Sequence, residues 1–404
     1  MSLNQAFNEM FTTRSAGTQV SSGFGSMFPW FGGDGKATMA TAKTAFTLSS
    51  FYNGVDQLSN DMAKLPKYVL KKEGESRIKY TDHPVNYLIS QRPNDLMNAF
   101  DFWKIVEVLC IVKGNAYGKI IRNSRTGMPS QLQICDNEDV LVLKNDEKLY
   151  YRIKGELYDS ADILHFKGFS FNGIIGVGVV TFAAKQLGIS LDAQNYQQEV
   201  YRDLGLGYGV IQSDQDVNAT NKKMIEDGFA EKMSSKNKFK VPLLDSGMKY
   251  QSISVSPAEA QFLETNKNGI LEVARWLNIA PHKLKDLSQG NFSNIYQQSI
   301  EHVQDSILPR VISKEQEINN KLFSIADAGN IYCKFNITSL LRGDLEMKSK
   351  YYTSAIYAGY MTRNEVRALE DMNPIDGLEE PLQPVNMQAL SVAAELLKSQ
   401  KDGK

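Results

Sequence analysis

The strongest constraint on what this chain can fold into lies between Asp344 and Glu365, where a helix stop is followed within a few residues by a helix start. Asp344 can cap a helix that runs through Tyr357, and Gly359 is well placed as the C-terminal stop of that helix. Thr362, with Glu365 three residues later, forms a capping box that opens the next helix. Two helices joined by so short a link are expected to form a tight elbow.

An amphipathic helix is predicted upstream of this elbow, with Ser293 as a candidate cap. Apolar residues recur along it at the spacing of one buried stripe, and the opposite face is polar or acidic. Pro309 is expected to bend or end this helix. The apolar stripe is Tyr296, Ile300, Val303 and Ile307, and the polar face is Gln297, Gln298, Glu301, Gln304 and Asp305.

The rest of the chain alternates helical periodicity with short β patterns, which predicts a mixed α+β protein. Pro66 ends the first predicted helix, and Pro281 restarts the chain after a later one. The predicted helices are Phe46–Lys64, His83–Ser90, Ala99–Val112, Val179–Asp203, Glu259–Leu277 and a stretch to Phe323, and the predicted strands are 67–72, several between Tyr117 and Phe166, 241–255 and 330–340.

Residues 1–43 are interpreted as a disordered N-terminal arm, because they are rich in Gly, Ser and Thr and show little periodicity. The segment 28–36, FPWFGGDGK, is the apolar exception and is a candidate for docking on a neighbour. A loose arm is the favoured interpretation. No signal peptide and no apolar stretch of about 18 residues is present, so a membrane protein is not expected.

Charge and cysteine content exclude several function classes. The 404 residues, enough for about two to three domains, carry 45 Lys+Arg against 46 Asp+Glu. This balance argues against a chain held to nucleic acid or lipid by bulk charge. The three cysteines are odd in number and far apart, so they predict no disulfide framework and suggest a reducing compartment.

No catalytic, cofactor or metal site is predicted. The four histidines form no HExxH motif and lie near no cysteine pair, and His165 is interpreted as a satisfied, half-buried histidine. The glycine-rich run ending in Gly35-Lys36 lacks the spacing of a phosphate-binding loop and is followed by Ala37 rather than Ser or Thr. The densest basic run, Lys232–Lys240, is interpreted as a solvated loop rather than a nucleic-acid patch, because it has no arginine and one aromatic residue.

A series of short motifs runs in order across residues 44–390. The motifs are Val55–Pro66, His83–Pro84, Arg92–Asn94, Lys113–Tyr117, Gly127–Pro129 with Leu132, Asp162–His165, Gly173–Gly178, Glu272–Pro281, Asn291–Gln298, Leu308–Pro309, Glu317–Leu322, Leu341–Asp344 and Thr362–Arg367. Each motif is weak alone, but in this order they resemble the HK97-type portal proteins of tailed bacteriophages. Two positions depart from the family's pattern: Gly178 replaces a small hydroxyl residue, and Phe292 replaces a tyrosine.

The resemblance implies an α+β portal fold assembled as a homo-oligomeric ring, usually of twelve copies, at one vertex of the capsid. Double-stranded DNA would pass through its channel during packaging and ejection. The implied partners are the large terminase subunit, the major capsid protein and a head-completion adaptor. The implied location is the virion, after assembly in the host cytoplasm. The implied parts are a wing at 44–290, a first stem helix at 291–308, a clip at 309–342, a second stem helix at 343–358, a tunnel loop and tunnel helix at 359–379, and a short crown with the C-terminal tail at 380–404.

The resemblance also assigns candidate site residues. Gly359, Tyr360 and Met361 would form the tunnel loop, with Tyr360 and Met361 narrowing the channel; ordinary turn packing is the alternative. A channel that lets DNA slide must not neutralise phosphates firmly. The candidate channel-lining residues on the first stem helix are Gln297, Glu301, Gln304 and Asp305. Two other functions stay open: another capsid component, such as a head-tail adaptor or minor head protein, and an enzyme of unknown type.

Overall fold

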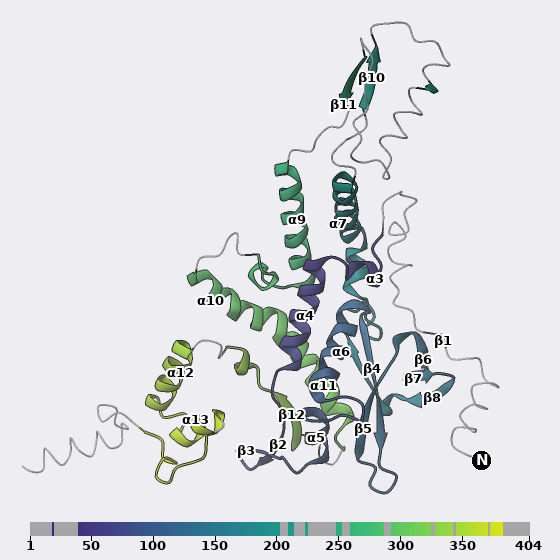
Figure 1. The fold of residues 1–404 in the computed structure, drawn as a ribbon. Coiled ribbons are helices and arrows are strands. Elements are labelled where there is room, and N and C mark those ends of the chain that lie inside the picture. The colour runs from purple at the N-terminus through teal and green to yellow at the C-terminus, as the bar shows by residue number, and fades with distance from the viewer. Residues whose placement is uncertain are drawn as a thin grey trace, which may run out of the picture. The chain divides into compact units, whose positions relative to one another are not determined.

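The computed structural model divides the chain into two compact units, Met1–Phe335 and Asn336–Lys404. All strands of the described residues lie in the first unit. Figure 1 shows the ribbon of both units. The structure describes residues 18–19, 39–202, 209–213, 223–224, 248–252, 259–286, 292–324, 327, 329–341, 345–370 and 372–382.

The β-structure of the first unit is divided among small antiparallel sheets, with strand orders β1-β6-β7-β8, β12-β2-β3, β5-β4-β9 and β10-β11. The order β12-β2-β3 joins segments more than 250 residues apart in the chain. The strands are β1 (Thr18–Gln19), β2 (Lys67–Glu73), β3 (Ser76–Lys79), β4 (Asn115–Arg122), β5 (Pro129–Cys135), β6 (Val140–Asn145), β7 (Lys148–Ile153), β8 (Glu156–Asp159), β9 (Ile163–Lys167), β10 (Gly209–Ser213), β11 (Met248–Ser252) and β12 (Ile331–Phe335).

Helices connect and cover these sheets, and α11 contacts both β9 and β12. The α-helices are α3 (Ala42–Ala45), α4 (Ser49–Ala63), α5 (Pro84–Ser90), α6 (Ala99–Val112), α7 (Val179–Arg202), α9 (Glu259–Leu277), α10 (Phe292–Glu301), α11 (Leu308–Lys321), α12 (Leu345–Tyr357) and α13 (Arg363–Leu369). Single turns of 3₁₀-helix occur at η2 (Asn137–Asp139), η3 (Ser160–Asp162), η5 (Pro281–Leu284) and η7 (Ile337–Leu341), and η6 (His302–Ile307) is a π-helix.

Helices α4 and α6 pack together at the centre of the first unit. The apolar stripe of α4 is buried as its spacing predicts, with Phe51, Val55 and Leu58 each at most 1% exposed. Asn98 caps α6, since its Oδ1 accepts a hydrogen bond from the Asp101 amide at 2.8 Å. Burial of each apolar side chain of the α4 stripe contributes about 1.5–3 kcal/mol relative to an exposed one.

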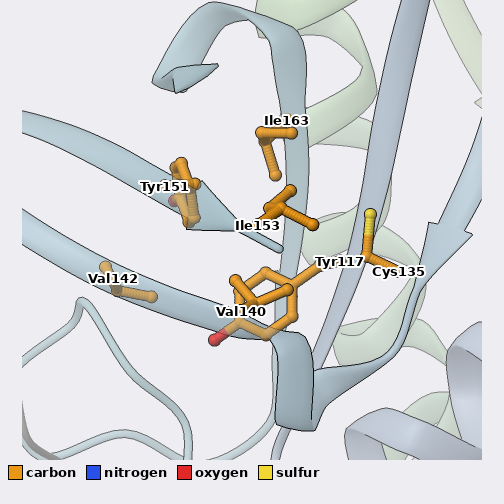
Figure 2. Close-up of a cluster of buried hydrophobic side chains, with 7 residues drawn as sticks. All are labelled: Tyr117, Cys135, Val140, Val142, Tyr151, Ile153 and Ile163. Atoms are coloured by element: carbon orange, nitrogen blue, oxygen red, sulfur yellow. The ribbon is translucent and has the colours of Figure 1, made fainter. Parts of the chain in front are cut away.

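A second cluster lies where the strands around β4 and β9 meet those of β6 and β7. Figure 2 shows its buried side chains, which come from two different sheets, β5-β4-β9 and β1-β6-β7-β8. Apolar burial therefore joins two sheets whose strands do not pair with each other. The cluster is Tyr117, Cys135, Val140, Val142, Tyr151, Ile153 and Ile163, with Ile174 and Ile175 packed against it.

The Gly-Asn pair at the start of β4 fixes the loop before α7. Asn115 forms two hydrogen bonds with the Gly176 backbone: its Oδ1 accepts from the amide at 2.7 Å and its Nδ2 donates to the carbonyl at 2.8 Å. Gly114 has φ of +82°, and a Cβ built there would lie 2.4 Å from the Val177 carbonyl carbon. Only glycine allows the two backbones to approach so closely.

Several predicted elements are confirmed, including helices over Ala99–Val112 and Glu259–Leu277 with the predicted bounds. Two parts of the predicted disordered arm, residues 1–43, have regular structure: Thr18–Gln19 pair with β6, and α3 begins at Ala42. Ser293 is the second residue of α10 and not its cap.

The helix does not end at Pro309, one of the two predicted outcomes, but continues through it as α11. Pro309 has no amide hydrogen for the Asp305 carbonyl four residues earlier. Asn278 supplies a replacement donor, and its Nδ2 lies 3.1 Å from that carbonyl oxygen. The π-helix η6 directly precedes α11, and π-helical turns are one way in which helices adjust locally.

Candidate functional site

One face of the α10–η6 helix carries the polar residues predicted to line a channel. Gln297, Glu301, Gln304 and Asp305 are all exposed. The structure brings them together on one side, with Gln297 Nε2 3.4 Å from Glu301 Oε1. The face holds two carboxylates and two amides and no basic residue among these four, so it offers no cation to a phosphate.

The opposite face of this helix is anchored in the first unit. Val303 and Ile307 are 5% and 0% exposed. His302 is also buried, and its Nε2 is 2.9 Å from Asp61 Oδ2 on α4. Both side chains of this pair are almost fully buried. The position of the polar face is therefore fixed by apolar burial and by a buried pair.

Burial opposes ionisation of Asp61, but hydrogen bonds outweigh it. His302, Lys64 and Gln57 all bond to the Asp61 carboxylate, and together they lower the pKa of Asp61 from 3.8 to about 2. The carboxylate is thus ionised at neutral pH. The contact between this carboxylate and His302 links η6 to α4.

In the second unit, the turn between α12 and α13 is the predicted elbow. Gly359 adopts φ of +72°, a conformation that favours glycine, and its amide donates to the Ile356 carbonyl at 3.1 Å. The capping box is confirmed in both directions: the Glu365 amide donates to Thr362 Oγ1 at 3.1 Å, and the Thr362 amide donates to Glu365 Oε2 at 2.7 Å.

This turn presents Tyr360 to solvent. Tyr360 is 59% exposed and its hydroxyl forms a hydrogen bond with Tyr351 on α12, while Met361 is half-buried. Thr362 follows at once as the cap of α13. Because the elbow is short and capped on both sides, the aromatic ring is displayed from a defined backbone.

The two helices of the elbow are clamped by Glu370. Its carboxylate pairs with Lys348 and accepts a hydrogen bond from the Tyr352 hydroxyl at 2.6 Å, both on α12. Asn364 on α13 binds the returning chain, with its Nδ2 2.9 Å from the Ile375 carbonyl. These contacts link α12, α13 and residues 372–382 into one small unit.

Sequence analysis assigned two further helices, α7 and α9, to the wing. Helices α7 and α9 contact each other, and Ser190 Oγ lies 3.3 Å from the position that a Cβ at Gly269 would occupy. Figure 1 shows them side by side and running in opposite directions. In the sequence they flank β10 and β11. Both helices are predicted from their periodicity, but no local pattern indicates that they pair.

One histidine and two cysteines, His165, Cys110 and Cys333, are buried. His165 is buried between the Tyr151 hydroxyl and Asn115 Oδ1, and burial lowers its pKa to about 3. It is thus satisfied, and more deeply buried than predicted. Burial also raises the pKa of the Cys110 thiol to about 12 and that of the Cys333 thiol further. The described residues contain no cluster of His, Cys, Asp and Glu suited to a metal ion.

Two sequence segments weighed as ligand sites lie outside the described residues: the glycine-rich run at 32–36 and the basic run Lys232–Lys240. None of the described helices combines the length and the apolar character that a bilayer span requires.

The chain is similar in sequence to known portal proteins. The family model described as "Phage portal protein" matches residues 49–371. The portal protein of Enterobacteria phage HK97 is 26% identical over 340 residues, covering 82% of this chain and 80% of the relative. The probable portal protein of Streptomyces phage phiC31 is 26% identical over 380 residues, covering 86% of this chain and 80% of that protein.

Solved structures show the same fold. An HK97-family phage portal protein from Corynebacterium diphtheriae matches with a TM-score of 0.58 at 17% identity, covering 77% of this chain and 99% of the other. A chain from the neck of a native gene transfer agent particle, computed with C12 symmetry, matches with a TM-score of 0.55 at 17% identity, covering 91% of this chain and 99% of that one.

Proposed function

This chain belongs to the phage portal protein family, of the HK97 type, and from that premise we propose that twelve copies close into a ring around a channel for double-stranded DNA. Portal proteins are structural components of the virion neck, and the proposed role is accordingly structural rather than enzymatic. The C12 symmetry of the matching neck supports twelve copies. A closed ring needs two different complementary faces on each subunit.

The observation that carries the channel proposal is the exposed, capped elbow at Gly359–Met361. Tyr360 and Met361 are proposed to narrow the bore, and the exposed α10–η6 residues Gln297, Glu301, Gln304 and Asp305 are proposed to line it. An uncharged or acidic wall releases phosphates easily, since each neutralised phosphate adds affinity that translocation must reverse.

The proposed division of the chain follows the family order: an N-terminal arm, a wing, two stem helices with a clip between them, a tunnel loop and helix, and a crown. In this scheme the stem helices are 291–308 and 343–358, the clip is 309–342, and the crown starts at 380. The wing at 44–290 then holds the α4–α6 centre and most of the sheets.

One observation favours a second assignment of the stem. Helices α7 and α9 pack directly against each other and flank the β10–β11 segment in sequence. This matches the pattern of two stem helices joined by a clip. The alternative places the stem at 179–202 and 259–277 and the clip at 203–258, and it leaves the α10–η6 face available to the channel.

The finer partners belong to the same proposal. During packaging the ring would dock the large terminase subunit and sit among major capsid proteins, and a head-completion adaptor would later replace the terminase. Assembly would take place in the host cytoplasm before incorporation at one capsid vertex.

Negative-stain or cryo-electron microscopy of the purified chain tests the ring. We expect end-on views of a hollow ring and a native mass near twelve subunits of 45.3 kDa. A chain that stays monomeric, even with its capsid proteins present, contradicts the proposal. A smaller assembly that binds only to preformed portals would instead indicate an adaptor or minor head protein.

A further inference from the structure

The antiparallel sheet β12-β2-β3 of the first unit has an inner and an outer face (Figure 1). Successive side chains of a strand point to opposite faces of a sheet. The inner face packs into the core, where Val69 and Cys333 are 0% exposed and Phe335 is 2% exposed. The residues between these positions therefore form the outer face.

The outer face alternates basic and aromatic side chains. The strand register places Lys72 directly opposite Arg77 on β3, and Tyr68 directly opposite Lys334 on β12. The row between these two pairs runs across the three strands as Tyr332, Leu70 and Lys79. All four basic residues are exposed, and the two tyrosines are half-buried.

Most of this positive charge has no carboxylate partner. Lys334 pairs with Glu315 at 2.8 Å. The other three basic residues of the outer face pair with no carboxylate among the residues that the structure describes. Glu73 belongs to the opposite face by strand alternation and pairs with Lys71 at 2.9 Å, and the exposed Glu75 lies in the turn beyond the strands. The whole chain has a net charge of −1, so this excess of cations is local.

The tyrosine rings hold the lysines on the face. Lys79 Nζ lies 4.2 Å from the ring centroid of Tyr68, and Lys72 Nζ lies 5.9 Å from that of Tyr332. Both distances are those of cation–π contacts. Proteins that bind single strands stack bases on open aromatic rings. Because an ammonium group already lies over each ring, this face offers cations instead, which suits the phosphates of a duplex.

The density of the cations also favours DNA over an acidic polypeptide. Neighbouring strands lie about 4.8 Å apart and alternate residues of a strand about 6.7 Å apart, so the three cations without a carboxylate partner extend over about 7 Å. That length of duplex DNA carries about four phosphate charges. An extended acidic peptide presents only one carboxylate to a face every 6.7 Å or so.

We propose that the outer face of the β12-β2-β3 sheet binds the phosphate backbone of duplex DNA outside any channel. Such contacts carry no sequence preference. One subunit binds weakly, with a Kd of about 10⁻⁶–10⁻⁴ M, as is usual for non-specific binding. The inference goes beyond the proposed channel function, because it needs neither a ring nor the passage of DNA.

Fluorescence anisotropy with a short labelled duplex at several salt concentrations tests the binding. The variant Lys72→Gln, Arg77→Gln and Lys79→Gln removes the three cations that have no carboxylate partner. It should weaken binding at least about tenfold at about 50 mM salt and reduce the log–log salt slope by about 2–3, because each lost phosphate contact contributes about 0.9. Unchanged affinity and slope overturn the inference.

A matched control changes the net charge by the same amount elsewhere in the first unit. Lys144→Gln, Lys148→Gln and Lys154→Gln removes three exposed cations from β6, β7 and the turn after β7. This variant should keep the affinity and the salt slope of the wild type. An equal loss in both variants overturns the inference, because binding then depends on net charge alone. Circular dichroism confirms that both variants are folded.

Covalently closed circular DNA separates this face from the channel, because a closed circle cannot thread a closed ring. The wild type should retard such a circle on a gel, and the variant of the sheet should not, while native mass spectrometry reports ring formation independently. Rings that form but do not bind the circle overturn this inference and leave the channel proposal intact. A chain that binds the circle without forming rings supports this inference and contradicts the ring.

Chemical footprinting tests the site without any substitution. Bound duplex should slow the acetylation of Lys72 and Lys79 by an N-hydroxysuccinimide ester, and it should leave Lys144 and Lys148 unprotected. Equal protection of all four lysines overturns the site. Tighter binding of a single-stranded oligonucleotide assigns the face to unpaired bases, and tighter binding of poly-glutamate assigns it to an acidic protein; either result overturns the choice of duplex DNA.

Discussion

Lys314 Nζ on α11 lies 2.5 Å from Glu107 Oε2 on α6, and the two side chains are 5% and 0% exposed. Arg310 Nη1 lies 2.6 Å from the other carboxylate oxygen. Burial opposes ionisation of Glu107, but the two neighbouring cations outweigh it and hold its pKa below the ordinary value. This ion cluster joins the helix that follows the polar α10–η6 face to the centre of the first unit.

Removing one partner of this cluster should be severely destabilising. Glu107→Leu leaves Lys314 buried without its counter-charge, and we expect the free energy of unfolding to fall by about 3–5 kcal/mol. Adding Lys314→Met should restore most of the loss, because a buried pair can be replaced by apolar side chains at little cost. Urea denaturation of the single and double variants measures both effects.

The exposed pair Lys71–Glu73 provides the control. Its side chains are 45% and 53% exposed, and Glu73→Leu should change the free energy of unfolding by at most about 1 kcal/mol. Equal losses from the buried and exposed variants would show that the Glu107 cluster does not anchor α11.

Gly114 should tolerate no side chain. In Gly114→Ala the new Cβ would meet the backbone at Val177, and the φ of +82° adds further strain. We expect a loss above about 3 kcal/mol or failure to fold. Gly127→Ala is the matched control: its φ is +68° but no atom lies within 4 Å of the new Cβ, so it should cost only about 1–2 kcal/mol. Thermal melting of both variants measures the difference, and similar melting temperatures would refute the close-approach explanation.

Local sequence patterns predicted the elements that are determined by near neighbours. The capping box at Thr362, the stop at Gly359 and the bounds of α6 all depend on residues within a few positions. The continuation of α11 through Pro309 was not predictable, because the replacement donor Asn278 lies 27 residues from the Asp305 carbonyl. The β2–β12 pairing and the α7–α9 contact were not predictable for the same reason, because each joins segments that are far apart in the sequence.

In the candidate site, too, the features set by local sequence were predictable, and those that depend on distant residues were not. The polar face of α10–η6 followed from helical spacing, and its exposure is observed for Gln297, Glu301, Gln304 and Asp305. The buried His302–Asp61 pair that holds this face spans 241 positions of the chain and had no sequence signal. Resemblance identified the Gly114-Asn115 motif, but its physical cause became clear only from the backbone at Gly176–Gly178.

The His302–Asp61 pair predicts a pH dependence of stability. Asp61 has a pKa of about 2 when folded and an ordinary value of 3.8, so the unfolded chain binds its proton more readily. The stabilisation is complete above about pH 5 and is lost as the pH falls through 4 toward 2. Between pH 5 and pH 2, Asp61→Asn should therefore lose about 2 kcal/mol less stability than the wild type.

Urea denaturation at a series of pH values measures this difference. Asp56→Asn serves as the control. Asp56 lies on α4, as Asp61 does, and forms a partly exposed ion pair with Lys104 on α6. Parallel curves for Asp61→Asn and the wild type would show that the buried pair makes no contribution at acid pH.

Tyr360 and Met361 should affect DNA passage without affecting assembly. Replacing both by Gly removes the exposed ring and leaves the capping box at Thr362 in place, so rings should form while packaging or retention of DNA falls. Tyr360→Phe keeps the bulk of the aromatic ring and should package and retain DNA normally. Tyr87→Ser removes a comparably exposed tyrosine of the first unit and serves as the control. Packaging assays with purified heads would reject the assigned role if the double Gly variant packages normally.

Lysines placed on the lining should make the channel grip DNA. If α10–η6 faces the bore, Gln304→Lys with Asp305→Lys adds two cations per subunit at positions that now offer none. Each phosphate that they neutralise should steepen the salt dependence of DNA affinity by about 0.9 in log–log slope. Packaging should therefore slow and recover at higher salt, because screening weakens the new contacts.

Two further pairs make this test selective. Asp192→Lys with Gln194→Lys changes exposed residues of α7, and Glu75→Lys with Glu147→Lys changes exposed turns of the wing. The wing pair should leave the salt dependence of packaging unchanged. If the α7 pair changes the salt dependence of packaging and the Gln304–Asp305 pair does not, the channel is lined by α7 and α9 instead. The reason is that only residues that contact the passing phosphates can release counterions from them.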